Sequence, residues 1–246
     1  MAISGSIAAG RRDASSAIAI DGPVASGKSS VGSRVAGALG WPFVDTGTMY
    51  RAITWLALQR GIDPGDAERV SALAEAATMC VRPPAAGSAE YAIVIVDGED
   101  ATPMLRTPAV ERAVSIVSAV PRVRRRMVAL QRELAAEHPV VMAGRDIGTV
   151  VLPDARLKVF LDASAETRAG RRAAELARRG RPSAPAAVLA ETLARDRLDS
   201  ERADSPLAAA ADAIVLHTDG LGEDDVVARV LELAQRSFGP QAQPAR

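Results

Sequence analysis

The chain has 246 residues, of which 48% are apolar and 24% are charged, and its 30 basic residues balance its 30 acidic ones. That length can bury one sizeable core and a small inserted unit, as in an ordinary globular protein. A formal net charge of zero excludes binding of DNA, RNA or an anionic membrane through overall charge alone, so any anion must be held locally.

The cysteine and histidine content argues against a disulfide or a zinc site. Cys80 is the only cysteine, and His138 and His217 do not stand at metal-ligand spacing. No segment approaches the roughly 18 apolar residues of a membrane span. We therefore expect a cytoplasmic protein without membrane contact, with residues 1–16 as a flexible extension and residues 239–246 as a flexible tail.

The first predicted unit is a strand, a glycine-rich turn and a helix. Ala17–Asp21 is a short apolar run, and Lys28–Leu39 places apolar residues at helical spacing. Between them, GPVASGKS matches the phosphate-loop pattern G-x-x-x-x-G-K-[ST], in which backbone N–H groups and a helix N-terminus surround a polyphosphate. Lys28 is expected to reach the β- and γ-phosphates of ATP, and the Ser29 hydroxyl to bind Mg²⁺. The residues expected to contact ATP are Gly22, Pro23, Val24, Ala25, Ser26, Gly27, Lys28, Ser29 and Ser30.

The second predicted unit supplies candidates for binding a phosphate acceptor. Phe43–Asp45 is a short strand that leads into a helix predicted over Thr48–Arg60, with Gly61 at its end. The segment DTGTMYR puts Thr46 at a strand end and Arg51 in the first turn of the helix. Both could face an acceptor phosphate; the alternative is a helix cap with a surface arginine.

Two segments interrupt the alternation of strands and helices. Residues 63–107 contain the β-rich run Tyr91–Val96 followed by the turn-prone pair Asp97-Gly98, which predicts a small antiparallel hairpin within an insertion. Residues 178–187 combine Arg-Gly, Arg-Pro and Ser-Ala-Pro between two helices, which is typical of a moving lid.

The remaining apolar runs complete a predicted sheet. Pro139–Met142, Leu157–Leu161 and Ala213–Leu216 show no alternation, which is typical of strands covered on both faces of a parallel sheet. Helices are predicted over Ala109–Val120 and Arg122–Glu137, divided by a proline. These patterns predict the α/β class, with a parallel sheet flanked by helices.

A phosphate loop alone fits kinases, switches, motors and transporters. The chain contains no asparagine, so the N-K-x-D guanine reader of GTPase switches is impossible, and no part resembles a long mechanical domain. A small-molecule kinase is therefore favoured. A nucleotide acceptor would need arginines for its phosphate, polar groups for its sugar and a reader for its base.

Six segments narrow the class further: AIAIDGPVASGKSS, DTGTMYR, VDGEDATPMLRT, PRVR, GRDIGTVVLPDA and RDRLDSERADSPL. In this order they resemble the bacterial cytidylate kinases, from about Ala17 to Phe238. The resemblance implies the α/β fold of P-loop nucleoside monophosphate (NMP) kinases, a five-stranded parallel sheet flanked by helices, with 63–107 as the NMP-binding insertion and 178–187 as the lid. It also implies transfer of the γ-phosphoryl group of MgATP to CMP or dCMP, in pyrimidine nucleotide metabolism, by a monomer.

The resemblance also assigns a base reader. Ser115, Arg124 and Asp146 fall where the family binds the base. Cytosine donates from N4 and accepts at N3 and O2, and these side chains provide the matching acceptor and donors. Uracil reverses two of those bonds, so CMP should be preferred to UMP.

By the same resemblance, Arg51, Arg145 and Arg202 would hold the acceptor phosphate with help from Thr46. Arg195 and Asp199 would lie near the sugar, and their spacing with Arg202 of i, i+4 and i+7 predicts one shared helix face. The catalytic residues implied are Lys28, Arg145 and Arg202, while Arg168, Arg171, Arg178 and Arg179 flank the lid and offer candidates for an arginine finger.

The chain departs from the family pattern at two positions. Ala143 stands where the family usually carries an acidic residue that orients metal-bound water. Two outcomes stay open: Asp146 or Asp21 compensates for the missing carboxylate, or Mg²⁺ is held more weakly. Val24 replaces a small polar residue of the phosphate loop. Two alternatives stay open: another small acceptor such as UMP, dTMP or a shikimate-like metabolite, and an ATP-binding regulatory protein that transfers no phosphate.

Overall fold

The computed structural model describes residues 16–239 except 85–87, 89 and 203. The predicted N-terminal extension, apart from residue 16, and the predicted tail, apart from residue 239, lie outside these described residues.

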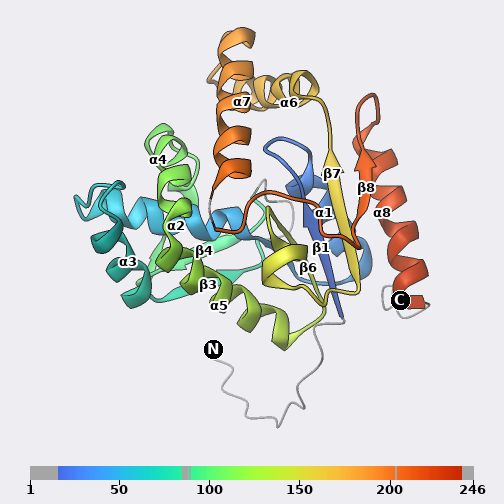
Figure 1. The fold of residues 1–246 in the computed structure, drawn as a ribbon, viewed down its shortest axis with the longest axis horizontal. Helices are drawn as coiled ribbons and strands as arrows, with labels where there is room; N and C mark the ends of the chain where they lie inside the picture. Colours follow the sequence, from blue (N-terminus) through green and yellow to red (C-terminus); the bar gives the residue numbers. More distant parts are fainter. Residues whose placement is uncertain (1–15, 85–87, 89, 203, 240–246) are drawn as a thin grey trace.

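A five-stranded parallel sheet forms the centre of the molecule, as predicted (Figure 1). The strand order is β2-β6-β1-β7-β8, so β1, which precedes the phosphate loop, is the middle strand. Because all five strands run the same way, their carboxyl ends meet at one edge of the sheet. The strands are β1 (Ala17–Asp21), β2 (Phe43–Asp45), β6 (Val140–Gly144), β7 (Leu157–Asp162) and β8 (Ile214–His217).

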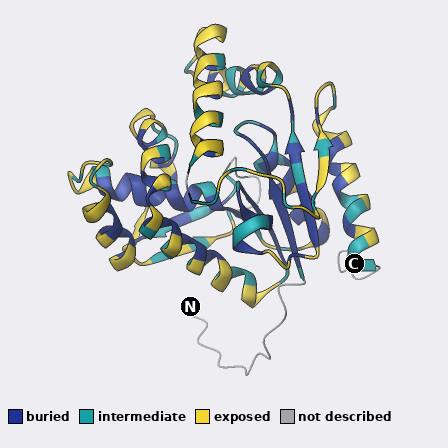
Figure 2. Ribbon diagram, viewed as in Figure 1, coloured by how far each residue is buried: buried dark blue, intermediate teal, exposed yellow. Residues whose placement is uncertain are grey.

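Helices cover both faces of this sheet. Along β1, Ile18 and Ile20 pack with α1 (Lys28–Leu39) and α8 (Glu223–Phe238), whereas Ala17 and Ala19 face a second core cluster. That second cluster includes residues of α2 (Thr46–Gln59), α4 (Pro108–Ala119) and α5 (Pro121–Glu137). Every residue of β1 and β6 is buried, which explains the unbroken apolar runs in the sequence (Figure 2).

The insertion is a small α/β unit. The hairpin predicted at Asp97-Gly98 is present, and both turn residues have positive φ, as a type I′ turn requires. Its three-stranded antiparallel sheet contains β3 (Met79–Arg82), β4 (Ile93–Val96) and β5 (Glu99–Asp100), and a 3₁₀ helix follows at Thr102–Met104. Helix α3 (Ala67–Ala76) was not predicted from the sequence, although the Asp66 carboxylate caps it by accepting from Arg69 N at 3.1 Å.

Two helices stand above the carboxyl end of the sheet. They are α6 (Ala165–Arg178) and α7 (Pro185–Glu201), and the segment between them falls within the predicted lid (Figure 1). Much of α7 is exposed (Figure 2). A single π-helical turn, Ile147–Val151, follows β6 and carries the chain away from the sheet edge.

Three sequence predictions need correction. Helix α2 begins at Thr46 rather than Thr48, because the Asp45 carboxylate accepts from Gly47 N at 3.0 Å and caps it there; Arg51 therefore lies in the second turn. Helix α7 ends at Glu201, and Arg202 has extended backbone, so it does not share the helix with Arg195 and Asp199.

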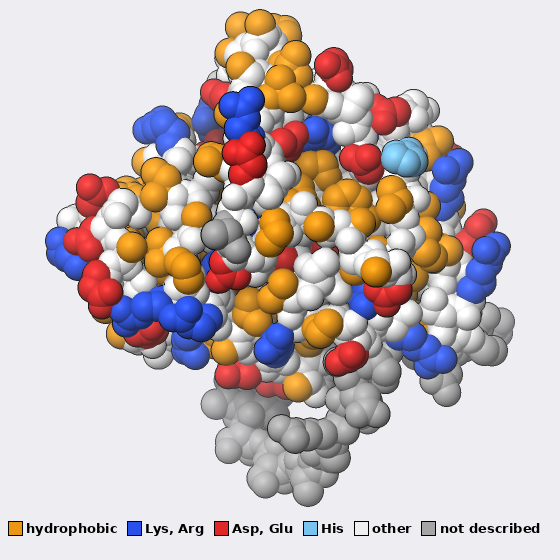
Figure 3. All heavy atoms as spheres, viewed as in Figure 1, with side chains coloured by type: hydrophobic (Ala, Val, Ile, Leu, Met, Phe, Trp, Pro, Cys, Tyr) orange, Lys and Arg blue, Asp and Glu red, His pale blue; other side chains and the backbone are white. Residues whose placement is uncertain are grey.

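Strand β8 also differs from the prediction. It lies beside β7 at the edge of the described sheet, and Ile214 and Val215 are 40% and 43% exposed, so this run is not covered on both faces. Acidic and basic side chains are interspersed over the face of the molecule in Figure 3. Within the described residues, no helix is both long and apolar enough to cross a membrane.

Candidate active site

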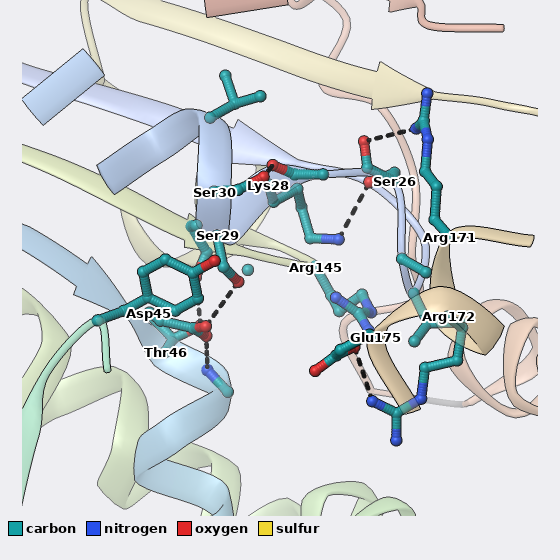
Figure 4. A pocket seen from close by; sticks show the side chains of 18 of the residues that line it. Ser26, Lys28, Ser29, Ser30, Asp45, Thr46, Arg145, Arg171, Arg172 and Glu175 are labelled. Carbon is teal, nitrogen blue, oxygen red and sulfur yellow. Dashed lines mark hydrogen bonds and ion pairs between the residues drawn. The ribbon is translucent and has the colours of Figure 1, made fainter. Parts of the chain in front are cut away.

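A cavity of about 840 Å³ opens at the carboxyl ends of β1, β2 and β6 (Figure 4). Its volume lies in the range of small-molecule binding sites. The phosphate loop and the start of α1 line one side, and residues of α2, α6 and α7 line others. Elements far apart in the sequence therefore contribute to one cleft.

The phosphate loop has the backbone geometry that its glycines permit. Gly22 has φ 148°, and a Cβ there would lie 2.2 Å from Leu161 O, so only glycine fits. Gly27 has φ 96° and directly precedes α1. The N-terminus of α1 and the loop N–H groups form an anion-binding end of the helix. Of the nine residues predicted to contact ATP, the seven from Val24 to Ser30 line the cavity.

Lys28 lies buried in this loop without a carboxylate at bonding distance among the described residues. Its Nζ donates to Pro23 O at 2.5 Å and to Ser26 Oγ at 3.2 Å. Burial and the nearby Arg145 guanidinium lower the pKa of Lys28 well below its usual range. A buried ammonium group of this kind is a favourable partner for a polyphosphate, which would supply the missing negative charge.

Ser29 and Asp45 bring two hard oxygen donors together beside Lys28. The Ser29 hydroxyl donates to Asp45 Oδ2 at 2.7 Å, and Asp45 pairs in register with Ala143 on the adjacent strand (Figure 4). Asp45 thus places a carboxylate next to the position where the family pattern expects an acid. Of the two residues expected to compensate for Ala143, Asp146 lines the cavity and pairs with Arg124, whereas Asp21 does not line the cavity.

Four arginines converge on the other side of the cavity: Arg51, Arg106, Arg145 and Arg195. Burial lowers the pKa of Arg51 to about 9, with further lowering by repulsion from Arg195, Arg106 and Arg145. The Asp45 carboxylate raises this pKa but does not offset these effects. Burial and Arg145 likewise lower the pKa of Arg195. The Nε atoms of Arg51 and Arg195 have no hydrogen-bond partner among the described residues. Buried cations that repel one another define a site for a dianion such as a phosphate monoester.

Arg145 connects this cluster to α7. Its Nε donates to Asp199 Oδ2 at 2.7 Å, and Arg145 and Arg195 lower the pKa of Asp199 against the opposing effect of burial, which is the largest single contribution. The Thr46 hydroxyl donates to Ala143 O at 2.9 Å and is buried at the same strand edge. The structure therefore brings together Thr46, Arg51, Arg145, Arg195 and Asp199 of the predicted acceptor set.

A second group surrounds Asp146. Arg124 Nη2 is bonded to Asp146 Oδ2, and Arg202 Nη2 lies 3.7 Å from Asp146 Oδ1. All three side chains are buried, and the Arg124 guanidinium also lies 5.6 Å from the centroid of the Tyr50 ring. Ser115 lies beside them in an adjoining cavity of about 290 Å³, which Asp199 and Arg202 also line.

The lid side of the cavity carries a network of charges. Arg172 Nη2 lies 2.6 Å from Glu111 Oε1, and Arg172 Nη1 lies 2.8 Å from Glu175 Oε2 (Figure 4). Arg171 donates to Thr218 O at 2.8 Å. Arg178 and Arg179 line the cavity but are exposed, whereas Arg168 does not line it.

Asp21 anchors the π-helical turn that follows the predicted base reader. Its carboxylate accepts from Ile147 N at 2.8 Å and from Gly148 N at 2.7 Å. Burial nevertheless raises the pKa of Asp21 from 3.8 to about 6, because the two backbone hydrogen bonds only partly offset it.

This raised pKa predicts a pH-dependent contribution to stability. The folded protein binds the Asp21 proton more tightly than the unfolded chain, so this contribution is complete below about pH 4 and is lost as pH rises to about 6. The expected loss is about 3 kcal/mol of the free energy of unfolding. Urea unfolding of the wild type and Asp21→Asn should therefore give a difference that changes across this window; parallel pH profiles would contradict the assignment.

Several lining residues were not singled out from the sequence. Asp45 and Arg106 occur within the quoted segments DTGTMYR and VDGEDATPMLRT, so the segments themselves carried the signal. Arg172, Glu175 and Tyr91 lie outside those segments, and only the tertiary fold brings them to the cavity.

The fold and the site define a P-loop phosphotransferase. The family model described as Cytidylate kinase matches residues 18–236. The cytidylate kinase of Geobacillus kaustophilus (strain HTA426) is 46% identical over 222 residues, covering 90% of this chain and 97% of its own. That of Mycolicibacterium paratuberculosis (strain ATCC BAA-968 / K-10) is 47% identical, covering 89% and 95%. The chain belongs to the cytidylate kinase family.

The solved structures that match this chain include a gluconokinase from Sinorhizobium meliloti 1021. It covers 92% of this chain and 95% of its own, at 18% identity and a TM-score of 0.45.

Proposed function

We propose that this protein transfers the γ-phosphoryl group of MgATP to CMP or dCMP, giving ADP and CDP or dCDP. The observation that carries the proposal is the pairing of two anion sites across one cavity. The phosphate loop with Lys28 forms one, and the cluster around Arg51 forms the other. Two phosphorylated molecules can thus bind in one cavity with their phosphates facing each other.

The donor half holds the polyphosphate of ATP. The loop N–H groups and Lys28 would bind its phosphates, while Ser29 and Asp45 would hold Mg²⁺. Their hydroxyl and carboxylate oxygens suit this ion, which commonly takes one or two protein ligands and completes its shell with water and phosphate oxygens. When bound, Mg²⁺ supplies positive charge to the phosphate oxygens and helps to align them.

The acceptor half orients the nucleoside monophosphate. Arg51 and Arg195, whose Nε atoms find no partner among the described residues, would bind the acceptor phosphate together with Arg145. Arg202 would add charge from beside Asp146. This arrangement fixes the attacking phosphate oxygen in line with the γ-phosphoryl group, which is what a loose phosphoryl-transfer transition state needs more than a strong base.

The base reader would combine Asp146, Arg124 and Ser115. Asp146 can accept from the cytosine N4 amino group, and Arg124 can donate to its acceptors. Their mutual bond holds both side chains in fixed positions before a nucleotide arrives. We infer that this reader favours cytosine over uracil and that the protein acts as a cytoplasmic monomer.

The reaction is tested by incubating the wild-type protein with MgATP and CMP and separating the nucleotides by ion-exchange chromatography. ADP and CDP should appear in equal amounts. When CMP is omitted, no CDP can form and ADP release should be slower. ADP without CDP would indicate ATP hydrolysis or another acceptor, and unchanged nucleotides would favour an ATP-binding protein without transfer.

A further inference from the structure

The Arg168 side chain differs from the other arginines that flank the lid because it is buried and each of its three guanidinium nitrogens donates a hydrogen bond. Its Nε donates to Ala163 O at 2.9 Å, and its Nη1 donates to Val24 O at 3.3 Å. The same guanidinium binds Asp196 through two parallel bonds of 3.0 and 2.6 Å. This two-bond arrangement fixes the angle between the two side chains as well as their distance.

These contacts join parts of the molecule that bind different substrates. Val24 belongs to the phosphate loop, and Ala163 follows β7. Asp196 lies on α7 between Arg195 and Asp199, two residues of the acceptor side. Arg168 itself is on α6, which packs against α7 above the carboxyl end of the sheet (Figure 1). A single guanidinium thus connects the donor loop to the acceptor helix.

Neither Arg168 nor Asp196 lines the cavity, so the pair does not reach the reacting groups directly. The Val24 side chain cannot form hydrogen bonds, so Arg168 contacts this turn of the loop through the Val24 backbone carbonyl. We propose that Arg168 and Asp196 are a positioning pair that sets the phosphate loop and α7 at the separation required for in-line transfer. The inference rests on the proposed phosphoryl transfer.

The pair should affect turnover more than substrate binding. Each substrate has its own binding residues on its own side, so breaking the link leaves ATP and CMP bound but misaligned. We expect Asp196→Asn, whose amide cannot accept both arginine bonds, to lower kcat by between about 10-fold and about 100-fold. The KM values for ATP and CMP should change by less than about threefold, because the residues that bind each substrate are unchanged. Arg168→Lys should have an intermediate effect, because an ammonium group retains the charge without the fork.

A matched control is available in the bidentate pair of Arg122 and Glu75. Arg122 donates to the two Glu75 oxygens at 3.0 and 2.8 Å and joins α5 to α3 away from the cavity. Glu75→Gln makes the same chemical change as Asp196→Asn and should leave kcat unchanged.

The experiment measures steady-state kinetics, thermal unfolding and the affinity for a fluorescent ATP analogue in the wild type and the three variants. A selective loss of kcat in Asp196→Asn, with ATP affinity retained at a temperature where every variant is folded, supports the positioning pair. A lower melting temperature with kcat within about twofold of wild type would show a purely structural pair and overturn the inference. An equal loss in Glu75→Gln would overturn it too, and a wild type inactive with CMP would overturn the proposed function itself.

Discussion

Replacing Lys28 with methionine should lower kcat by about 10³-fold or more while leaving the protein at least as stable as the wild type. In the proposed reaction the ammonium group would lie where charge develops on the transferring phosphoryl group, and a fixed cation of this kind commonly contributes several kcal/mol to transition-state stabilisation. The measurement is coupled ADP release at saturating MgATP and CMP, with circular dichroism to verify the fold.

The expected stability follows from the sign of the pKa shift. The pKa of Lys28 is lowered in the folded protein, so folding opposes its protonation and the buried charge destabilises the fold at neutral pH. Methionine removes that charge, and the melting temperature at pH 7 should stay the same or rise.

Lys158, the other lysine of the chain, is the natural comparison. It lies outside the cavity and bonds to both oxygens of Asp212 at 2.9 and 2.7 Å. Lys158→Met should therefore lower stability but keep kcat. Near-normal turnover in Lys28→Met would contradict the role assigned to Lys28.

The second large effect is expected at the buried pair of Arg124 and Asp146. Arg124→Met leaves the Asp146 carboxylate buried, and its remaining ion-pair partner among the described residues is Arg202 at 3.7 Å. Removing one partner of a buried ion pair typically destabilises a protein by about 3–5 kcal/mol. Urea unfolding should show this loss, and the KM for CMP should rise because the base reader is incomplete.

A double-mutant cycle separates the pair from its surroundings. The variant carrying both Arg124→Met and Asp146→Asn should be more stable than Arg124→Met alone, since no unpaired carboxylate remains buried. Arg122→Met, which removes an arginine two positions earlier whose side chain is 35% exposed, should lower stability far less than Arg124→Met. If Arg124→Met is equally mild, the pair does not stabilise the folded state.

The fold followed from the sequence wherever local patterns carried the information. Unbroken apolar runs predicted the buried strands β1 and β6, and the Asp97-Gly98 pair predicted the hairpin turn. Helix ends were less predictable. Helix α2 begins earlier than predicted because the Asp45 carboxylate accepts a capping hydrogen bond from Gly47 N. The exposure of β8 depends on its position at the sheet edge, which no local pattern records.

The candidate site followed from the sequence only in part. The phosphate loop is contiguous, so its residues could be named from one segment. The acceptor side collects arginines from α2, α7 and the segment after β6, and burial, together with repulsion between these arginines, lowers the pKa values of Arg51 and Arg195. Asp45, which belongs to the segment DTGTMYR, lies in register with Ala143 on the neighbouring strand, a proximity that the linear sequence does not reveal.

Acceptor selectivity under MgATP tests the central claim most directly. Coupled ADP release would give kcat/KM for CMP, dCMP, UMP, AMP, dTMP and shikimate. CMP and dCMP should exceed UMP by at least about tenfold, because each mismatched buried hydrogen bond costs about 1–3 kcal/mol. Faster turnover of UMP, dTMP, AMP or shikimate than of CMP would contradict the assignment of Ser115, Arg124 and Asp146 as a cytosine reader.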